Sequence, residues 1–256
     1  MIIQKKTLKN ILFIDIETVS LTQNFHELTE ALQHLWISKS RQFLSDRSME
    51  MSDELASTFY KEKAGIFAEF AKVVCISVGY LSNLDEDQPI LRIKSLYGDE
   101  VDILQSFNEM MNIHYDDLDE YYLCGHNIKE FDIPFICRRN IINGLELPRL
   151  LNISGKKPWQ LKHLVDTMDL WRFGDYKNYT SLALLAGCLN IPSPKDDIDG
   201  SKVGQVFWEK NDIDRIVTYC EKDVLTVAQV AMKFAGLALL EEENIEIVKN
   251  VSIAVE

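Results

Sequence analysis

The sequence has no apolar run long enough to cross a membrane as a helix, which takes about 20 residues. The apolar stretch at residues 11–16 is short and is interrupted by Asp15. The first residues, Met1 to Lys6, do not form a signal peptide. We therefore expect a cytoplasmic protein that does not associate with membranes.

Cysteines are few, and no two of them form a Cys-x-x-Cys pair. The five are scattered along the chain and odd in number, which argues against a disulfide framework. We expect reduced thiols that mostly fill the core, at Cys75, Cys124, Cys137, Cys188 and Cys220.

The sequence also lacks repeats, low-complexity runs and any linker rich in proline or glycine. With 256 residues, of which 46% are hydrophobic, the chain can form a sizeable core. Residues 20–70 contain no proline and many good helix formers. We therefore predict one domain over residues 1–256, with a mostly helical insertion at about 20–70.

Positive charge is scarce, since 27 Lys and Arg stand against 40 Asp and Glu, for a net charge of −13. Non-specific binding to nucleic acid depends on Lys and Arg at the phosphates, so this balance argues against a protein that binds long duplexes. It argues less against an enzyme that holds a few nucleotides at one end. Bound divalent ions would reverse the local sign of charge in such a pocket.

Hydrophobic periodicity predicts alternating strands and helices. Three strands, followed by alternating helix and strand, indicate an α/β domain with a mixed sheet. The predicted strands cover residues 11–16, 72–82, 89–96, 121–124 and 164–170, and the predicted helices cover 99–114, a segment from 134, 179–189 and 212–240.

A pair of acids lies on the first predicted strand and at its end, in Ile14-Asp15-Ile16-Glu17-Thr18. Asp15 and Glu17 face the same side of a strand, where two carboxylates repel unless a cation lies between them. The alternative is an edge strand with two solvated acids. The apolar flank from residue 11 to 14 favours a buried strand, which rarely carries two acids without a function.

A second acidic segment is Asn127-Ile128-Lys129-Glu130-Phe131-Asp132. Asp132 precedes Pro134, where a helix is predicted to begin, and the positive end of a helix favours a carboxylate. The alternative is that Asp132 merely caps this helix. His126 is expected to be structural, because no second His or Cys lies nearby to complete a metal site.

The third segment is Tyr219-Cys220-Glu221-Lys222-Asp223. Tyr219 and Asp223 project from one face of the predicted helix because they lie four residues apart. Asp223 flanks the apolar stripe, at the boundary between core and cleft. An acid and a phenol there suit a metal ligand beside a group that holds water, but a solvated Asp with a half-buried Tyr is the alternative.

Together the three segments resemble the Exo I, Exo II and Exo III motifs of the DEDD exonuclease superfamily, and Tyr219-x-x-x-Asp223 matches its tyrosine subtype (DEDDy). The chain is most similar to stand-alone relatives of the proofreading domain of family B DNA polymerases. The matching stretches, from about residue 10 to 235, include residues 70–79, 125–127, 199–203 and 219–224.

The resemblance implies an RNase H-like mixed β-sheet flanked by helices, and a 3′–5′ exonuclease. It implies two Mg²⁺ or Mn²⁺ ions. Four acids would bind these ions and also act in catalysis: Asp15, Glu17, Asp132 and Asp223. Tyr219 would be a fifth catalytic residue. The expected substrate is the 3′ end of single-stranded nucleic acid, with DNA favoured, and the expected contacts are Thr18, Asn127 and Phe131. Because no polymerase region is present, we expect no proofreading in cis.

Residues 138–177 form the only clearly basic stretch, and they include aromatic side chains. Such a mixture can form a track for a single strand, although a solvated basic face over core aromatics is an equal alternative. Asp166 and Asp169 could support the site indirectly, or they could be ordinary acids at the end of a strand.

Three functions remain open at this point. The exonuclease could act on DNA or on RNA. The chain could instead be a catalytically silent binding module, although a retired site has no reason to keep unpaired acids. A metal-dependent enzyme acting on another phosphorylated substrate is the third possibility.

Overall fold

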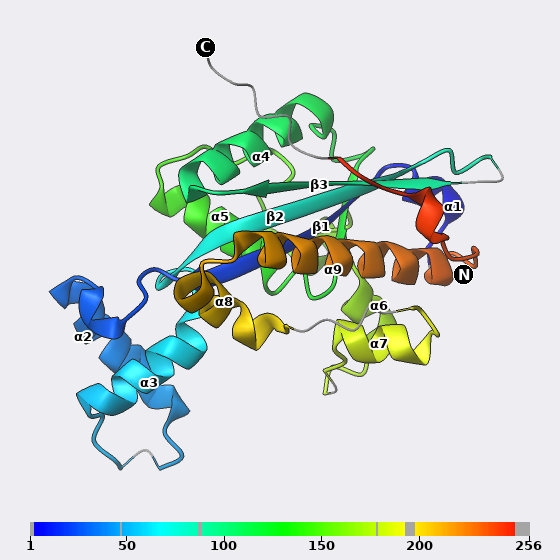
Figure 1. The fold of residues 1–256 in the computed structure, drawn as a ribbon. Coiled ribbons are helices and arrows are strands. Elements are labelled where there is room, and N and C mark those ends of the chain that lie inside the picture. Colours follow the sequence, from blue (N-terminus) through cyan, green and yellow to red (C-terminus); the bar gives the residue numbers. More distant parts are fainter. Residues whose placement is uncertain (1–2, 47, 87–88, 178, 193–197, 249–256) are drawn as a thin grey trace.

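The computed structural model describes residues 3–46, 48–86, 89–177, 179–192 and 198–248, which are built around a six-stranded sheet (Figure 1). The strands lie in the order β5-β4-β1-β2-β3-β6. Their bounds are β1 Ile11–Ser20, β2 Ala71–Ser82, β3 Ile90–Tyr97, β4 Tyr122–Gly125, β5 Leu164–Asp166 and β6 Ile245–Ile247.

The directions of the strands define the fold class. Strand β2 is antiparallel to both β1 and β3, whereas β1, β4 and β5 run parallel to one another and β6 runs parallel to β3. Helices flank this mixed sheet on both faces (Figure 1). The expected RNase H-like mixed sheet flanked by helices is therefore confirmed.

Helices α4 and α5 cover one face of the sheet, and α9 covers the other (Figure 1). Alternate residues of the central strands supply the two cores, since Phe13 packs on the α9 side and Ile14 on the α4 and α5 side. The helices are α1 Lys5–Leu8, α2 Glu30–Ser40, α3 Asp53–Lys63, α4 Glu100–His114, α5 Asp132–Ile142, α6 Thr167–Arg172, α7 Leu182–Cys188, α8 Val203–Lys210 and α9 Ile213–Phe234.

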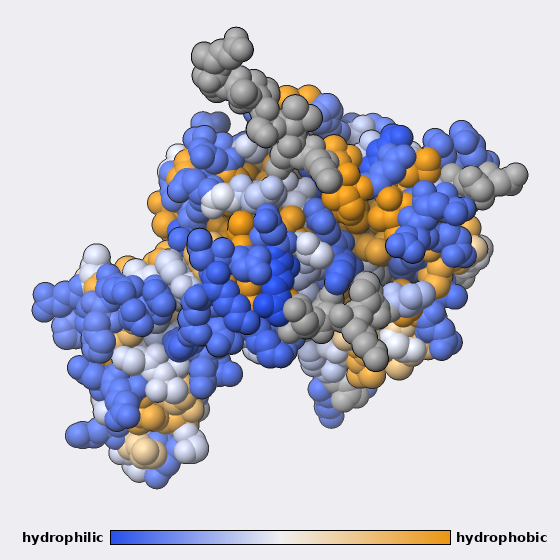
Figure 2. All heavy atoms as spheres, in the orientation of Figure 1, coloured by the Kyte–Doolittle hydropathy of each residue, from blue (hydrophilic) through white to orange (hydrophobic). Residues whose placement is uncertain are grey.

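The segment between β1 and β2 contains α2 and α3, which project from the sheet as a separate lobe (Figure 1). This lobe has its own apolar cluster around Trp36, whose indole N–H donates to the Ala56 carbonyl at 2.8 Å. The Tyr60 hydroxyl, 3.2 Å from the backbone nitrogen of Thr22, links the lobe to the end of β1. Its surface is mostly hydrophilic on the face shown in Figure 2. No helix in the described part of the chain is both long and apolar enough to cross a membrane.

Several elements differ from the sequence prediction. Strand β1 continues to Ser20 rather than ending at residue 16, the helix predicted at 179–189 begins at Leu182, and neither α8 nor β6 was predicted. Three further boundaries also differ. The strand predicted at 164–170 stops at Asp166, because the carboxylate of Asp166 accepts the N–H of Met168 and starts α6. Helix α9 ends at Phe234 rather than near 240, because Gly236 takes a positive φ of 71° and closes a Schellman motif. Helix α5 begins two residues before Pro134, at Asp132.

A buried ion pair joins α4 to α5 beneath the sheet. The guanidinium of Arg139 donates to Glu100 Oε1 at 2.8 Å and Oε2 at 2.6 Å, and also to the Ala68 carbonyl at 2.9 Å. Glu100 Oε1 accepts the Val73 N–H as well, at 2.8 Å. The side chains of Arg139 and Glu100 are only 5% and 10% exposed. Water therefore cannot solvate either charge if the other is removed.

We expect Arg139→Ala to lower the free energy of unfolding by about 3–5 kcal/mol, because it leaves the Glu100 charge buried without its partner. The adjacent Arg138 is exposed, so Arg138→Ala is the matched control and should change stability by less than about 0.5 kcal/mol. Urea denaturation of both variants measures the difference. An equal loss of unfolding free energy in both variants would show that the ion pair of Arg139 and Glu100 does not stabilise the fold.

Candidate metal-dependent nuclease site

Asp15 and Glu17 lie on β1 and face α9, while Ile14 and Ile16 pack into the opposite core. In the ladder with β2, Asp15 pairs with Ser77 and Glu17 with Cys75. The register shifts directly after Glu17, because Glu17 pairs with Cys75 and Thr18 with Val73, which leaves Val74 of β2 without a partner in the ladder. The pair lies on a central strand, so the edge-strand alternative is wrong.

Asp132 approaches the same strand from α5. Its Oδ1 accepts the backbone N–H of Ile16 at 3.2 Å, and its side chain is buried. The N-cap position of α5 is occupied by Phe131, so Asp132 is the first residue of the helix rather than its cap. The bond to Ile16 places the second acidic segment directly against the first.

A compact turn holds Asp132 in this position. Asn127 takes a positive φ of 65°, and its carbonyl accepts the N–H groups of Glu130 and Phe131. The carboxylate of Asp166, which is 1% exposed, accepts the N–H of Asn127 at 3.0 Å and of Lys129 at 3.2 Å. Asp166 therefore supports the site through the backbone of the second segment.

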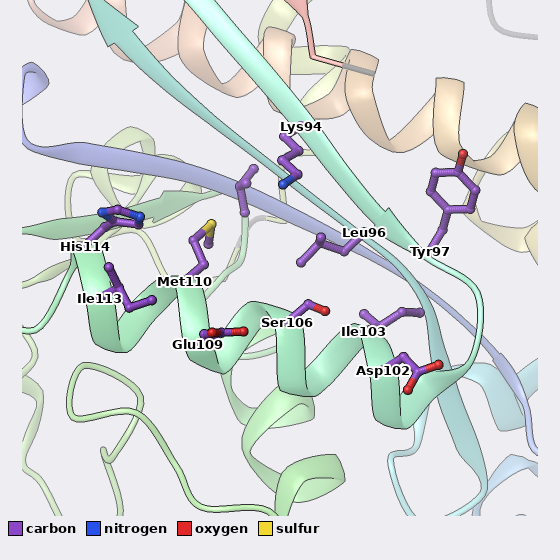
Figure 3. Close-up of a pocket in the computed structure, with 11 residues that line it drawn as sticks. Lys94, Leu96, Tyr97, Asp102, Ile103, Ser106, Glu109, Met110, Ile113 and His114 are labelled. Carbon is purple, nitrogen blue, oxygen red and sulfur yellow. The ribbon is translucent and has the colours of Figure 1, made fainter. Parts of the chain in front are cut away.

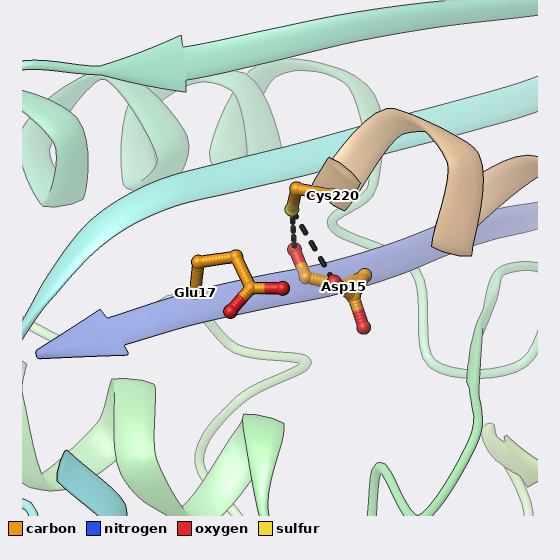
Figure 4. Close-up of side chains that lie close together, drawn as sticks. All are labelled: Asp15, Glu17 and Cys220. Carbon is orange, nitrogen blue, oxygen red and sulfur yellow. Dashed lines mark hydrogen bonds between the residues drawn. The ribbon is translucent and has the colours of Figure 1, made fainter. Parts of the chain in front are cut away.

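Helix α9 brings Tyr219 and Asp223 to the same place. Both side chains are half-buried, and the Tyr219 hydroxyl forms a hydrogen bond with Asp223. Cys220, between them, is fully buried and its Sγ lies 3.3 Å from Asp15 Oδ2 and 3.4 Å from the Asp15 carbonyl (Figure 4). We expected Cys220 only as a core thiol, and its contact with Asp15 was missed.

Burial and mutual repulsion raise the pKa of the acids. Burial is the main cause for Asp15 and Glu17, followed by the charge of Asp223, and both pKa values lie well above their usual range. Burial raises the pKa of Asp132 to about 7, against two backbone hydrogen bonds that lower it. Among the described residues no ion pair offsets the charge of Asp15, Glu17 or Asp132.

The donor set fits a divalent cation. Ligand atoms of Asp15, Glu17 and Cys220 all lie within 4.8 Å of one another. Glu17 is only 7% exposed and, within the part of the chain described, its carboxylate has no hydrogen-bond partner. A largely buried carboxylate without a protein partner is costly, and a bound cation would lower that cost.

The three expected substrate contacts are dispersed around the site. The Thr18 hydroxyl donates to the Gly65 carbonyl at 2.7 Å, so only its lone pairs are available to a ligand. Asn127 Oδ1 is buried, with no partner among the described residues. Phe131 packs partly into the core against Phe135, with the ring centroids 5.5 Å apart. Their roles toward a substrate stay predictions.

His126 has a structural place, as expected. Its Nε2 lies 2.8 Å from the Thr180 carbonyl and its Nδ1 lies 2.9 Å from the Thr167 hydroxyl, while burial lowers its pKa. The first contact ties the loop between α6 and α7 to the residue next to Asn127. The loop is thereby anchored beside the second acidic segment.

Exposed aromatic rings lie within the basic stretch and directly after it. Phe173 and Tyr176 are each 77% exposed, and Tyr179 is 67% exposed, all in the loop between α6 and α7. Trp159 is also exposed, at 68%. Trp171 instead stacks on Phe234, with the ring centroids 6.4 Å apart, and packs against the core.

A groove on the other face of the sheet lies away from the acids. It has a volume of about 520 Å³ and lies between α4 and β3, lined by Lys94, Leu96 and Met110 among others (Figure 3). Its floor includes Val78, which pairs with Ile14 on the face opposite the acids. The acidic site and this groove are therefore separated by the sheet.

The raised pKa values predict how the stability of the metal-free protein depends on pH. A carboxyl whose folded pKa is raised stabilises the fold fully below its unfolded pKa, and this contribution is lost as the pH rises through the folded pKa. For Asp132 the window runs from 3.8 to about 7. In EDTA, we expect the melting temperature to fall as the pH rises from about 5 to about 8.

Asp132→Asn keeps an oxygen that can accept the Ile16 N–H but removes the charge. Its melting temperature should therefore fall less steeply with pH than that of the wild type. Glu62→Gln, at an exposed position on α3, is the control and should leave the slope unchanged. Identical slopes in all three proteins would contradict the buried acidic cluster.

Comparison with known proteins identifies relatives of the chain. Residues 66–251 match a family described as a predicted 3′–5′ exonuclease related to the exonuclease domain of PolB. No curated protein matches the sequence.

One solved structure similar to this chain is the family B DNA polymerase from the hyperthermophilic archaeon Pyrobaculum calidifontis. The similarity has a TM-score of 0.49 and 15% identity, and it covers 88% of this chain but 27% of the polymerase chain. Because this similarity is weak and covers only part of the polymerase, no activity of the polymerase is assigned to this chain from it. The family match, in contrast, covers most of the sequence and includes the second and third acidic segments. The chain belongs to the family of predicted 3′–5′ exonucleases related to the exonuclease domain of PolB.

Proposed function

We propose that this protein is a metal-dependent exonuclease of the DEDDy type that shortens single-stranded nucleic acid from the 3′ end and releases nucleoside 5′-monophosphates. One observation carries the proposal. Three segments that are far apart in the sequence place their acids in one buried cluster, through contacts such as Asp132 with Ile16 and Cys220 with Asp15. Membership of a predicted 3′–5′ exonuclease family supports the same reaction.

Two Mg²⁺ or Mn²⁺ ions held by Asp15, Glu17, Asp132 and Asp223 would supply an ionised water and charge stabilisation at the leaving 3′-oxygen. The chain's own task is to hold the ligand oxygens in place before any ion binds. The Ile16 N–H orients Asp132, and the Cys220 thiol donates to Asp15. A site fixed in this way avoids reorganisation during the reaction.

Tyr219 is suited to hold the attacking water as a hydrogen-bond donor. Burial, and then the charge of Asp223, raises the pKa of its hydroxyl far above the neutral range. The phenol therefore keeps its proton at any working pH. It can orient a water molecule, but it is a poor base for removing the water's proton.

Single strands are the substrate class that the surface features favour, and we propose DNA ahead of RNA. The net charge of −13 gives little attraction for duplex phosphates. The exposed rings of Phe173, Tyr176 and Tyr179 offer stacking surfaces for unpaired bases, and His126 anchors their loop beside the site. Stacking depends little on the sugar, so RNA is the alternative substrate.

The proposed reaction is tested with linear single strands labelled at the 5′ end or internally, in Mg²⁺ and in EDTA. We expect stepwise shortening from a free 3′-hydroxyl, release of 5′-monophosphates, slower attack on blunt duplex and no product in EDTA. Asp15→Ala and Asp223→Ala should abolish turnover while leaving the fold intact. The control is Asp214→Ala, which removes an exposed acid from the same helix as Asp223.

Each alternative predicts a different result. Cleavage of a closed circular strand at an equal rate indicates an endonuclease. Binding of single strands without any product indicates a silent binding module. Full activity of Asp15→Ala would exclude the acidic cluster as the active site.

A separate prediction concerns Tyr219→Phe, which removes only the hydroxyl. We expect kcat to fall on the order of 100-fold, as when one preorganised donor is lost, with little change in KM. Metal affinity should survive because the four carboxylates remain. Single-turnover rates at saturating Mn²⁺ decide the question, and unchanged rates would mean that Tyr219 only packs against the apolar cluster around Val206.

A further inference from the structure

A sulfur atom lies among the carboxylates of the acidic cluster. The Sγ of Cys220 is 3.3 Å from Asp15 Oδ2, and the Glu17 carboxylate points toward the same space (Figure 4). Mg²⁺ and Mn²⁺ prefer oxygen ligands and do not need this sulfur. Thiophilic ions such as Zn²⁺ bind thiolate and carboxylate together.

The separation of the ligand atoms suits a small tetrahedral ion. A carboxylate oxygen at about 2.1 Å and a sulfur at about 2.3 Å from one tetrahedral ion lie roughly 3.6 Å apart. Asp15 Oδ2 and Cys220 Sγ are 3.3 Å apart, and the three ligand atoms of Asp15, Glu17 and Cys220 lie within 4.8 Å of one another. Small side-chain adjustments therefore suffice to surround an ion.

The state of Glu17 is a second, independent observation. Its side chain is only 7% exposed, and its carboxylate has no hydrogen bond or ion pair within the described part of the chain. It points toward the Asp15 side chain (Figure 4). A largely buried carboxylate without a protein partner, directed at a second carboxylate, is the arrangement that a cation completes.

We propose that Asp15, Glu17 and Cys220 form a binding site for a thiophilic divalent cation, represented by Zn²⁺ or Cd²⁺. On binding, the S–H bond of Cys220 breaks, its proton passes to solvent, and the sulfur forms a bond to the metal. No atom is oxidised or reduced. The ion lies between the same carboxylates that the proposed reaction uses.

Inhibition is the functional consequence. An ion held by a thiolate occupies Asp15 and Glu17 in a geometry set by sulfur, and hydrated Mg²⁺ cannot share it. Metal binding by Cys220 is independent of the proposed nuclease function, whereas inhibition rests on it.

Binding is measured with Cd²⁺, whose bond to thiolate gives an ultraviolet charge-transfer band. Every protein carries Cys188→Ala, because Cys188 is the one exposed thiol of the five and could bind Cd²⁺ by itself. We expect the band, with release of protons, in this background. Cys220→Ser should lose the band, although its hydroxyl can still donate to Asp15.

The matched control is Cys75→Ser, which changes the buried thiol opposite Glu17 on β2 and should keep the band. Circular dichroism and melting temperature establish that each variant is folded. No band at saturating Cd²⁺ in the background protein overturns the proposal. So does a band that Cys75→Ser abolishes and Cys220→Ser retains.

Nuclease assays in excess Mg²⁺ then measure inhibition by Zn²⁺, each protein being normalised to its own rate without Zn²⁺. We expect Cys220→Ser to need roughly 10-fold more Zn²⁺ for half-inhibition, or more, as is typical when a group supporting a metal site is lost. Equal sensitivity in both proteins overturns the inhibitory role. A Cd²⁺ band without any nuclease activity would instead reject the proposed function and leave the metal site standing.

Discussion

The rest of the site depends on one unfavourable interaction, the repulsion among carboxylates gathered in a buried place. Burial and the Asp223 charge raise the pKa of Asp15 and Glu17, so each acid makes its neighbours harder to ionise. Such a cluster keeps its shape without a cation only because the surrounding groups hold it. The Ile16 N–H holds Asp132, the Cys220 thiol holds Asp15, and Asp166 holds the turn before α5. These supports belong to three different elements, which explains why the motifs can be far apart in sequence.

The face of the sheet that carries the acids is distinct from the face that carries much of the stability. On the α4 and α5 side, a continuous apolar core and the pair of Arg139 with Glu100 join the helices to the sheet. On the α9 side, the acids interrupt the core between β1 and α9. The free energy lost at the acidic site is thus offset by packing on the α4 and α5 face of the sheet. A bound ion would add stability, because it would bind only the folded state. This arrangement lets a strained cluster persist in a folded protein.

Much of this arrangement was predictable from local rules. Alternation along β1 puts Asp15 and Glu17 on one side, and the spacing of four residues puts Tyr219 and Asp223 on one face of α9. The strands β2, β3 and β4 and the helix α4 also follow their hydrophobic patterns to within a residue or two. The sequence analysis did not predict elements that are very short or that form only through contacts with distant parts of the chain. Strand β6 has three residues and pairs with the outer edge of β3, and α6 replaces the second half of a predicted strand because Asp166 caps it.

The contact between Cys220 and Asp15 shows why a site cannot be completed from motifs alone. In the sequence, Cys220 belongs to the apolar stripe of its helix, and a buried free thiol is an ordinary core residue. Only the packing of α9 across β1 turns that core position into a neighbour of a carboxylate. When a helix places an acid from the border of its apolar stripe in a site, the neighbouring residues of the stripe also lie close to that site. The chemistry of this site is therefore set by the stripe as well as by the motif, and a sulfur next to hard oxygen ligands widens the range of ions that it can bind.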